Sequence, residues 1–574
     1  MAKPVIIDLD LMVVQGVLER ARVALSHEDH ACLAGLVQTL VDLSTMVRER
    51  GTTIARLRRL FGLHSSEKLR DVFGSAPEPP SDDAAACGPS AASSSDDRDA
   101  ADDRDVADDR NADDAGNGDA HDGTGEPPPK RKGHGRIGAS EYPHARRIHV
   151  EHDCLHWGDT CPGCAHGTLY QLREPERIVR VVGQAPLAAI AWECDRLRCS
   201  GCGGVFTAVA PTEAQGPKYD ERAVAMLALL RYGAGMPLHR LDRLQRNLET
   251  PVPASTQWEV VRDHVDALVP IYDELHRIAA CGRVLHNDDT SIRILELMGK
   301  RRVELVEAGE LPDPDRTGLF TTAVISVTDA GPIALFFSGR KHAGENFTSL
   351  LERRDPALPS PIHMCDGLDR NRPRGHLVLE NNCLAHGRRH IVDEVDNFPT
   401  ECRHVLEQLG KVFEHEATCR KQVLSDDERL AFHQRESGPV MAALEPWLRA
   451  ELDDKRIEPN SGLGEAFRYL LKRWTKLTLF LRVPGAPLDN NVCERALKMA
   501  IRHRNNSLFY RTMRGAKVGD VYMTLIYTAQ LHRENPFEYL VALLVHQADV
   551  AADPAAWLPW TFRATLARAS RAAA

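Results

Sequence analysis

The spacing of apolar residues predicts a helical segment at the start of the chain. Across residues 1–72 they recur mostly with helical periodicity, and a heptad register from Leu33 to Phe61 has apolar residues at eight of its nine a and d positions, Arg50 being the exception. This register predicts a short coiled coil and self-association. A helix packed on its own domain explains the pattern equally well, because Gly51 weakens the helix.

The next segment, residues 73–135, consists mainly of Asp, Ala, Ser, Gly and Pro, with almost no large apolar side chain. Such a composition cannot bury enough surface to offset its ordering entropy, so it predicts a disordered linker. Residues 81–128 carry fifteen acidic residues and three Arg, a local charge of −12, whereas the whole chain carries −10, which leaves +2 for the remainder. This slightly basic remainder permits a nucleic-acid partner without requiring one.

The middle of the chain changes from strand-like to helical patterning. Residues 140–212 suit strands and residues 213–280 suit helices. Strand-like runs follow at residues 283–287, 292–297, 320–327, 332–337 and 361–365. Nearly everything after them reads helical. This order predicts a multidomain α/β protein, with an α/β core at residues 281–530, a large helical insertion near residues 395–485 and a C-terminal segment at residues 531–574.

Composition restricts the class of protein. The chain has 574 residues, of which 43% are hydrophobic and 27% charged, as in globular proteins with an aqueous surface. No apolar run is long enough to span a bilayer. The first apolar stretch contains two Asp and makes a poor signal peptide. We therefore expect a cytoplasmic protein, nucleoid-associated when bound to DNA, without a membrane partner.

Two C-x-x-C pairs, Cys161 with Cys164 and Cys199 with Cys202, give a strong metal signal. Each pair presents two thiolates at a spacing suited to tetrahedral Zn²⁺, and the intervening segment suits strands. In a cytoplasmic chain, metal binding explains paired Cys better than disulfides do. The pattern predicts a zinc ribbon at residues 140–212 with a closed, structural Cys₄ site. Redox-inert free thiols are the less favoured alternative.

Residues 213–280 contain a possible helix-turn-helix. One helix begins after Pro237, a turn follows near residue 251, and Ser255 is a suitable N-cap for a second helix. A helix-turn-helix would place the second helix in a DNA major groove. Simple core packing is the alternative, since most helix pairs of this size only pack. The candidate DNA contacts here are Arg240, Arg243, Gln257 and Arg262.

Three carboxylates stand in contexts that suit a metal site. Asp288 and Asp366 end apolar strand-like runs, and Glu494 opens a helix that Asn490 or Asn491 is expected to cap. Carboxylates that converge in this way can hold two Mg²⁺ ions, which activate an attacking oxygen and stabilise a leaving oxygen at phosphorus. For each Asp taken singly, a turn or cap role is the alternative.

The order of these motifs and the residues within them resemble the insertion-sequence-66 family of transposases. The matching segments are Phe61-Gly62 to Leu69, the zinc ribbon, Pro237-Leu238, Asn287 to Thr290, Asp366-Gly367, Asn382 to Arg389, Asp489 to Leu497, Asn535-Pro536 and Leu558 to Trp560. Three positions depart from the family's usual residues. Asp289 replaces a Glu, Leu368 an aromatic residue and Asn505 a Lys.

The resemblance implies an RNase H-like catalytic domain with a DDE triad of Asp288, Asp366 and Glu494, which would bind two Mg²⁺ ions or Mn²⁺ in their place. It implies a DNA transposase that binds the terminal repeats of its element, hydrolyses a phosphodiester and joins the freed 3′-hydroxyl to target DNA. Expected partners are double-stranded DNA, further copies in a dimer or larger assembly, and small accessory proteins encoded by the same element. Further candidate DNA contacts are Arg388, Arg389, Lys498, Arg502 and Arg504.

Two other functions stay open on the sequence. One is a catalytically silent repressor derived from a transposase, which would bind terminal repeats without cutting them. The other is a metal-dependent nuclease that cuts DNA but does not join it. The intact triad of carboxylates favours the two enzymes over the repressor.

Overall fold

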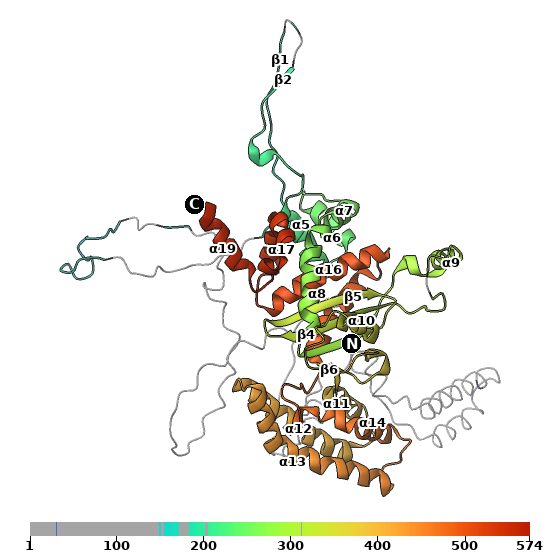
Figure 1. Cartoon of the computed structure of the whole chain (residues 1–574). Helices are drawn as coiled ribbons and strands as arrows, with labels where there is room; N and C mark the ends of the chain where they lie inside the picture. The colour runs from blue at the N-terminus through green and yellow to red at the C-terminus, as the bar shows by residue number, and fades with distance from the viewer. Residues whose placement is uncertain are drawn as a thin grey trace. The chain divides into compact units, whose positions relative to one another are not determined.

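The computed structural model of the chain describes His30 and residues 148–150, 154–170, 183–200, 202, 205–311 and 313–573 (Figure 1). The predicted coiled coil and acidic linker lie outside these residues. The chain divides into two compact units, residues 77–184 and the remainder. Each unit is described by itself.

A mixed sheet forms the centre of the larger unit. Its strands are β3 (Val284–Ser291), β4 (Phe320–Thr328), β5 (Gly331–Gly339), β6 (Ile362–Cys365) and β7 (Leu379–Asn382). They lie in the order β5-β4-β3-β6-β7, with β4 antiparallel to β3 and β5, and with β6 parallel to β3 and β7. The first strand in sequence is therefore central, which confirms the predicted α/β character.

The helices are longer and more numerous after the sheet than before it, as the periodicity predicts. The described helices are α5 (Glu221–Ala228), the π-helix η3 (Leu229–Gly233), α6 (Leu238–Asn247), α7 (Ala254–Asp263), α8 (Val269–Ala280), α9 (Gly299–Glu307), α10 (Ala343–Leu351), α11 (Leu384–Val392), α12 (Pro399–Lys421), α13 (Asp426–Asp453), α14 (Gly462–Leu477), α15 (Asn491–Ser507), α16 (Met513–Leu531), α17 (Pro536–Val545), α18 (Gln547–Ala552) and α19 (Phe562–Ala573). Among them, none combines the length and apolarity that crossing a membrane requires.

Three sequence predictions about elements were wrong. The run at residues 292–297 is not a strand: Leu295–Leu297 form a 3-10 turn, and Ile294 makes only an isolated bridge to Tyr510. Ser255 does not cap α7, because the helix already begins at Ala254 after Pro253. Strand β7 was missed because its sequence, Leu-Glu-Asn-Asn, lacks the apolar alternation of a half-buried strand.

The two faces of the sheet have different coverings. Helices α8 and α10 pack on one face, where Ser326 Oγ donates to Ala279 O (2.7 Å) and Asn346 Nδ2 donates to Thr322 Oγ1 (2.9 Å). Helix α15 packs on the opposite face, where Cys493 Sγ donates to Ala323 O (3.4 Å). Alternate residues of β3 and β4 therefore point to different helices.

Helices α11 to α14 are inserted between β7 and α15 and lie together on one side of the sheet (Figure 1). Their hydrophobic core includes Leu406, Phe467 and Leu470, and it extends to Val284 of β3 and Ile362 of β6. A capping box between Ser425 and Glu428 fixes the start of the longest of them, α13. Helices α12 to α14 lie within residues 395–485, whereas α11 precedes them.

Helix α16 covers the open edge of the sheet. The outward N–H groups of an edge strand otherwise invite pairing with another chain. Three α16 side chains, spaced four residues apart, accept these groups: Ser338 N donates to Asp520 (2.7 Å), Phe336 N to Thr524 (3.1 Å) and Ala334 N to Thr528 (3.2 Å). The stripe of polar residues on an otherwise apolar helix therefore satisfies one edge of the sheet.

The buried carboxyl group of Asp520 should make stability depend on pH. Burial raises the pKa of Asp520 to about 8, although Ser338 donates to it from both N and Oγ. In the unfolded chain the pKa is about 4, so the folded state binds the extra proton between about pH 4 and 8. The contribution of this group to the free energy of unfolding is therefore present below about pH 4 and is lost as the pH rises to about 8.

Asp520→Asn should reduce this pH dependence, because the amide stays neutral and can still accept from Ser338 N. The measurement is denaturant unfolding of both proteins at pH 5 and pH 8, with the exposed Asp549→Asn as the control. The variant should gain stability relative to the native chain at pH 8. Parallel pH profiles for all three proteins would contradict the argument.

Candidate active site

The sheet register brings Asp288 and Asp366 together. The parallel pairing of β3 with β6 places His286 beside Met364. Two residues further along each chain, Asp288 is still within β3, and Asp366 follows the last residue of β6. Both side chains are partly buried. Two carboxylates predicted from separate strand-like runs thus lie at the same edge of the sheet.

Glu494 approaches the same place from the first turn of α15. Its neighbour Cys493 donates to Ala323 O, and Ala323 is the β4 partner of Asp288 in the sheet. Burial, followed by the negative charge of Asp366, raises the pKa of Asp288 to about 7; Asp289 and Glu494 add to the effect. The three candidate carboxylates therefore share one electrostatic environment.

A buried amide connects α15 to the central strand. Asn490 is fully buried; its Nδ2 donates to Asn287 O (3.1 Å) and its Oδ1 accepts from His286 Nδ1 (3.0 Å). Its backbone N–H points at Cys383 Sγ (3.2 Å). Asn490 is the N-cap residue by position, but its side chain makes no cap hydrogen bond. The sequence did not reveal this contact, since an Asn before a helix normally indicates a cap.

Asp366 is oriented by the loop that follows it. Its Oδ1 accepts from Leu368 N (3.0 Å) and from Asn371 Nδ2 (2.9 Å). Gly367 between them has φ of +84°, and a Cβ there would lie 2.8 Å from Arg473 Nε, so glycine is required. The hydroxyl of Tyr469, on α14, donates to Asp366 O (2.8 Å). The helical insertion thus contacts the candidate site directly.

The side chain of the neighbouring Asp289 lies on the face of the sheet that α10 covers, opposite to α15. Its side chain is only 2% exposed and lies 3.1 Å from His342 Nδ1, 3.3 Å from Ala343 N and 3.4 Å from Arg370 Nη2. It therefore fixes the start of α10 rather than facing α15. The Asp289 carboxylate contacts α10 and Arg370 and not α15.

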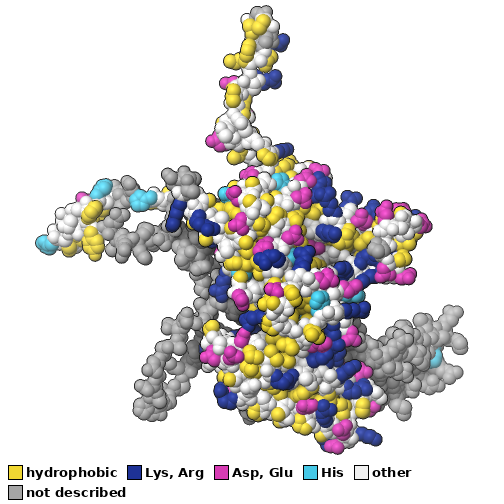
Figure 2. Space-filling view, in the orientation of Figure 1, with side chains coloured by type: hydrophobic (Ala, Val, Ile, Leu, Met, Phe, Trp, Pro, Cys, Tyr) yellow, Lys and Arg dark blue, Asp and Glu magenta, His cyan; other side chains and the backbone are white. Residues whose placement is uncertain are grey.

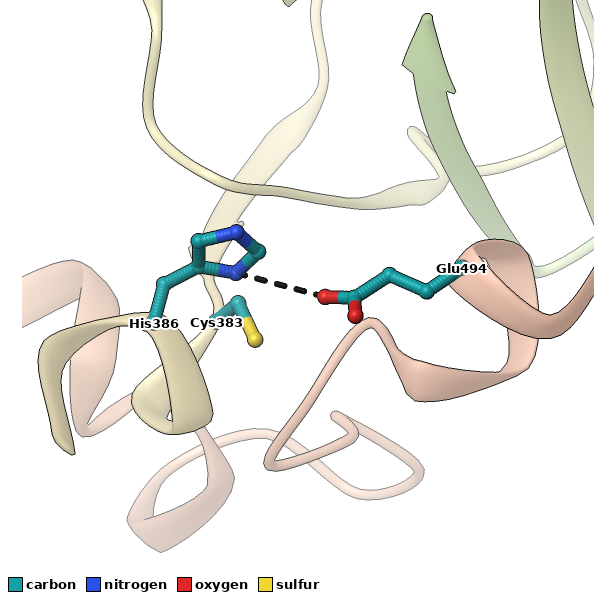
Figure 3. A group of neighbouring side chains, drawn as sticks. All are labelled: Cys383, His386 and Glu494. Atoms are coloured by element: carbon teal, nitrogen blue, oxygen red, sulfur yellow. Dashed lines mark ion pairs between the residues drawn. The ribbon is translucent and has the colours of Figure 1, made fainter. Parts of the chain in front are cut away.

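Helix α11 contributes two cationic or potentially cationic groups to Glu494. His386 Nδ1 lies 3.5 Å from Glu494 Oε1 (Figure 3). Arg389 Nη2 lies 3.7 Å from Glu494 Oε2. The sequence contained His386 only within the segment from Asn382 to Arg389 and gave it no role of its own. Arg389 contacts the candidate site itself, and Arg388 is half-buried on the same helix.

The basic residues predicted on α15 have different environments. Lys498 is exposed one turn beyond Glu494. Arg502 is exposed and approaches Gly233 O (3.4 Å). Arg504 donates to Thr290 Oγ1 (2.7 Å) and Ser291 O (2.9 Å), so it holds the end of β3. Lys498 is the best placed of the three for a phosphate near the carboxylates.

In the predicted helix-turn-helix region, Gln257 is not available to DNA. It is fully buried and donates to Val252 O (2.7 Å), because the turn before α7 folds its backbone carbonyl toward the helix. Arg240 and Arg243 are exposed on α6. Arg262 is half-buried and pairs with Asp263 (2.7 Å). The three Arg residues therefore stay candidates, and Gln257 does not.

Each C-x-x-C pair forms a turn with N–H groups directed at sulfur. Gly167 N points at Cys164 Sγ (3.4 Å), and Cys202 N points at Cys199 Sγ (3.5 Å). Hydrogen bonds from His166 and Gly167 lower the pKa of Cys164, which favours the thiolate that zinc binds. The second pair follows β1 (Arg196–Arg198) and precedes β2 (Val205–Thr207). The two pairs belong to different units, so the Cys₄ site stays a prediction.

Comparison with known proteins identifies the family. The model described as "Transposase IS66 family" matches residues 217–518, just over half of the chain. The chain belongs to the IS66 family of transposases. This confirms the resemblance seen in the sequence. The matched region runs from before α5 into α16 and contains all three candidate carboxylates.

Two related IS66-like sequences come from Sinorhizobium fredii. The uncharacterized protein y4hP is 25% identical over 411 residues, which cover 68% of this chain and 71% of the relative. The uncharacterized protein y4jD is 24% identical over 418 residues, which cover 70% of this chain and 78% of the relative. The similarity of this IS66-family chain to them therefore covers more residues than the family model matches.

Asn490→Ala should destabilise the protein by about 1–3 kcal/mol, because it leaves buried polar groups of Asn287 and His286 without partners. The matched control is Asn491→Ala, whose side chain is half-buried at the next position. Denaturant unfolding of both variants measures the difference. Equal losses for the two would show that the Asn490 side chain does not connect α15 to β3.

Proposed function

We propose that this IS66-family chain is a DNA transposase in which Asp288, Asp366 and Glu494 are the catalytic carboxylates. The observation that carries the proposal is their convergence from two strand ends and one helix that are far apart in sequence. Burial, followed by the charges of Asp366 and, more weakly, Glu494, raises the pKa of Asp288 to about 7. Active sites are common places for such mutually repelling carboxyl groups. The reaction class is displacement at the phosphorus of a DNA phosphodiester.

We infer that the core is RNase H-like. Support comes from the order and direction of its strands, with β3 at the centre. On one side of β3, β4 and β5 are each antiparallel to the preceding strand. On the other side, β6 is parallel to β3, and β7 is parallel to β6. In such a sheet, carboxylates on the first and fourth strands become neighbours. A helix after the last strand can then supply the third.

The donor set fits Mg²⁺, or Mn²⁺ in its place. Asp288, Asp366 and Glu494 offer hard oxygen ligands, and a bound cation would offset both the burial and the neighbouring negative charges that raise the pKa of Asp288. These three residues would hold two ions. When bound, the ions supply activation of the attacking oxygen and stabilisation of the leaving oxygen.

The chain's own groups orient these ligands. Asn371 and the N–H of Leu368 fix one oxygen of Asp366, while His386 and Arg389 lie against Glu494. Partners of this kind set ligand direction and commonly matter nearly as much as the ligands. The same arrangement can serve hydrolysis, with water attacking, and strand transfer, with a DNA 3′-hydroxyl attacking.

Basic side chains beside α10, on the other face of the sheet from α15, support DNA as the substrate. A pocket of about 500 Å³ beside the start of α10 is lined by Arg316, Lys341, Arg370, Arg372 and Arg374, with Glu345 and Asp369. On the face in Figure 2, Lys and Arg side chains are spread over the core and the insertion, among acidic and apolar ones. Phosphate contacts of this type position DNA without reading its sequence. Recognition of terminal repeats, assembly as a dimer or larger complex, and accessory proteins belong to the same proposal.

The decisive experiment uses Mg²⁺ and labelled DNA that carries the element's own ends. Glu494→Gln should reduce cleavage and joining at least on the order of a hundredfold, because metal-ion stabilisation is worth several kcal/mol. The matched control is Glu465→Gln, at an exposed position on α14, which should retain the native rate.

Three other results would replace this proposal. Cleavage by the native chain without joined product would indicate a nuclease. If the chain binds the DNA ends but neither cleaves nor joins them, even after the accessory proteins encoded by the same element are added, the result would indicate a repressor. Native rates from Glu494→Gln would remove Glu494 from the catalytic set.

The zinc ribbon gives a separate prediction. The full-length protein should hold one equivalent of zinc through both C-x-x-C pairs, and Cys199→Ser should lose it, because a Cys₄ site needs all four thiolates. Cys194→Ser, outside the pairs, should retain the metal. Metal analysis after gel filtration with a mild chelator measures this. Equal zinc in the two variants would contradict a four-cysteine site.

A further inference from the structure

Glu494 faces two donor atoms that the proposed transposase reaction does not use as ligands. Cys383 precedes α11, and His386 lies in its first turn. One ligand atom from each of Cys383, His386 and Glu494 lies within 4.8 Å of the others (Figure 3). The three side chains come from two helices and point toward a common space.

Two of these atoms have no hydrogen-bond partner among the described residues. They are His386 Nδ1 and Glu494 Oε1, which are both buried and lie 3.5 Å apart. Arg389 approaches the other carboxylate oxygen, Oε2. Buried polar atoms nearly always have partners, so a facing pair without them requires an explanation, such as a bound ion.

The chemistry of the donors selects the ion. A thiolate, an imidazole nitrogen and a carboxylate suit Zn²⁺ or a similar transition metal, whereas Mg²⁺ takes hard oxygen ligands. The N–H of Asn490, directed at Cys383 Sγ, would stabilise a metal-bound thiolate. We propose that Cys383, His386 and Glu494 form a Zn²⁺ site that shares Glu494 with the catalytic carboxylates.

A second cluster of the same three residue types has its carboxylate and imidazole groups hydrogen-bonded to neighbouring side chains. Glu416, Cys419 and His433 are equally close together in the insertion. There, Glu416 accepts from Arg420, Arg429 and His433 Nε2, and His433 Nδ1 lies 2.9 Å from Ser437 Oγ. Its carboxylate and imidazole are already hydrogen-bonded, and two Arg residues oppose a cation. The site at Glu494 has one Arg, Arg389, which lies 3.7 Å from Oε2, whereas His386 Nδ1 and Glu494 Oε1 have no hydrogen-bond partner among the described residues.

Sharing Glu494 has a functional consequence, which rests on the proposed transposase activity. A carboxylate committed to Zn²⁺ beside Cys383 and His386 is withdrawn from Asp288 and Asp366. Zinc should therefore inhibit Mg²⁺-dependent cleavage, and Mg²⁺ should counteract it. This site offers three protein ligands where the two C-x-x-C pairs offer four, so it should bind zinc more weakly than the Cys₄ site.

Titration of the metal-depleted full-length protein with Co²⁺ tests the site without DNA. Cobalt bound to thiolate gives a near-ultraviolet charge-transfer band, and Zn²⁺ should displace it. Cys383→Ala and His386→Ala should each bind one equivalent less than the native chain, whatever the Cys₄ site binds. The matched control, Cys419→Ala, should bind as many equivalents as the native chain. Circular dichroism checks that each variant is folded, and His386→Ala decides the test if Cys383→Ala is not.

The proposal is overturned if both site variants retain the native number of cobalt equivalents, or if Cys419→Ala loses one instead.

A second experiment tests zinc inhibition by measuring DNA cleavage against zinc concentration, relative to each protein's zinc-free rate. His386→Ala should need at least tenfold more zinc for half-inhibition. Unchanged zinc sensitivity in that variant would refute the shared ligand. A native chain that never cleaves DNA would defeat the proposed function, while the cobalt result would still decide the metal site.

Discussion

The confinement of three carboxylates to one partly buried place is the physical constraint around which the core is organised. Desolvation and mutual repulsion both disfavour this arrangement, as the raised pKa of Asp288 shows. The fold must therefore hold the groups together through other contacts. The parallel register of β3 and β6 fixes Asp366, and the buried amide of Asn490 fixes the start of α15. The site is thus maintained by backbone pairing and neutral hydrogen bonds.

The helical insertion is part of this support. Tyr469 on α14 donates to the backbone of Asp366, while His386 and Arg389 on α11 lie against Glu494. The hydrophobic core of these helices includes Val284 of β3 and Ile362 of β6, so the insertion is packed directly on the strands that carry Asp288 and precede Asp366. On the other side, α16 closes the edge of the sheet with its polar stripe. Without α16 the sheet would expose the edge of β5. Without the helical insertion the carboxylates would be held in place by fewer contacts.

Sequence patterns were informative where a local signal coincides with its tertiary role. Apolar runs ending in Asp predicted where Asp288 and Asp366 would lie, and helical periodicity predicted the insertion. Patterns were misleading where a distant partner decides the role. Asn490 reads as a helix cap but bonds to β3, Gln257 reads as a DNA contact but fills a buried turn, and polar β7 is a strand because β6 pairs with it. Periodicity reports burial, but it does not identify partners.

The alternation of β3 explains why adjacent acidic residues can have separate functions. Asp288 faces α15 and the other two carboxylates, whereas Asp289 faces α10 and contacts His342 and Arg370. Arg370 also lines the basic pocket proposed for DNA phosphate. A change at residue 289 therefore acts on the α10 face of the sheet, while a change at residue 288 acts on the carboxylate cluster. Adjacent positions of one strand thus lie in two separate environments.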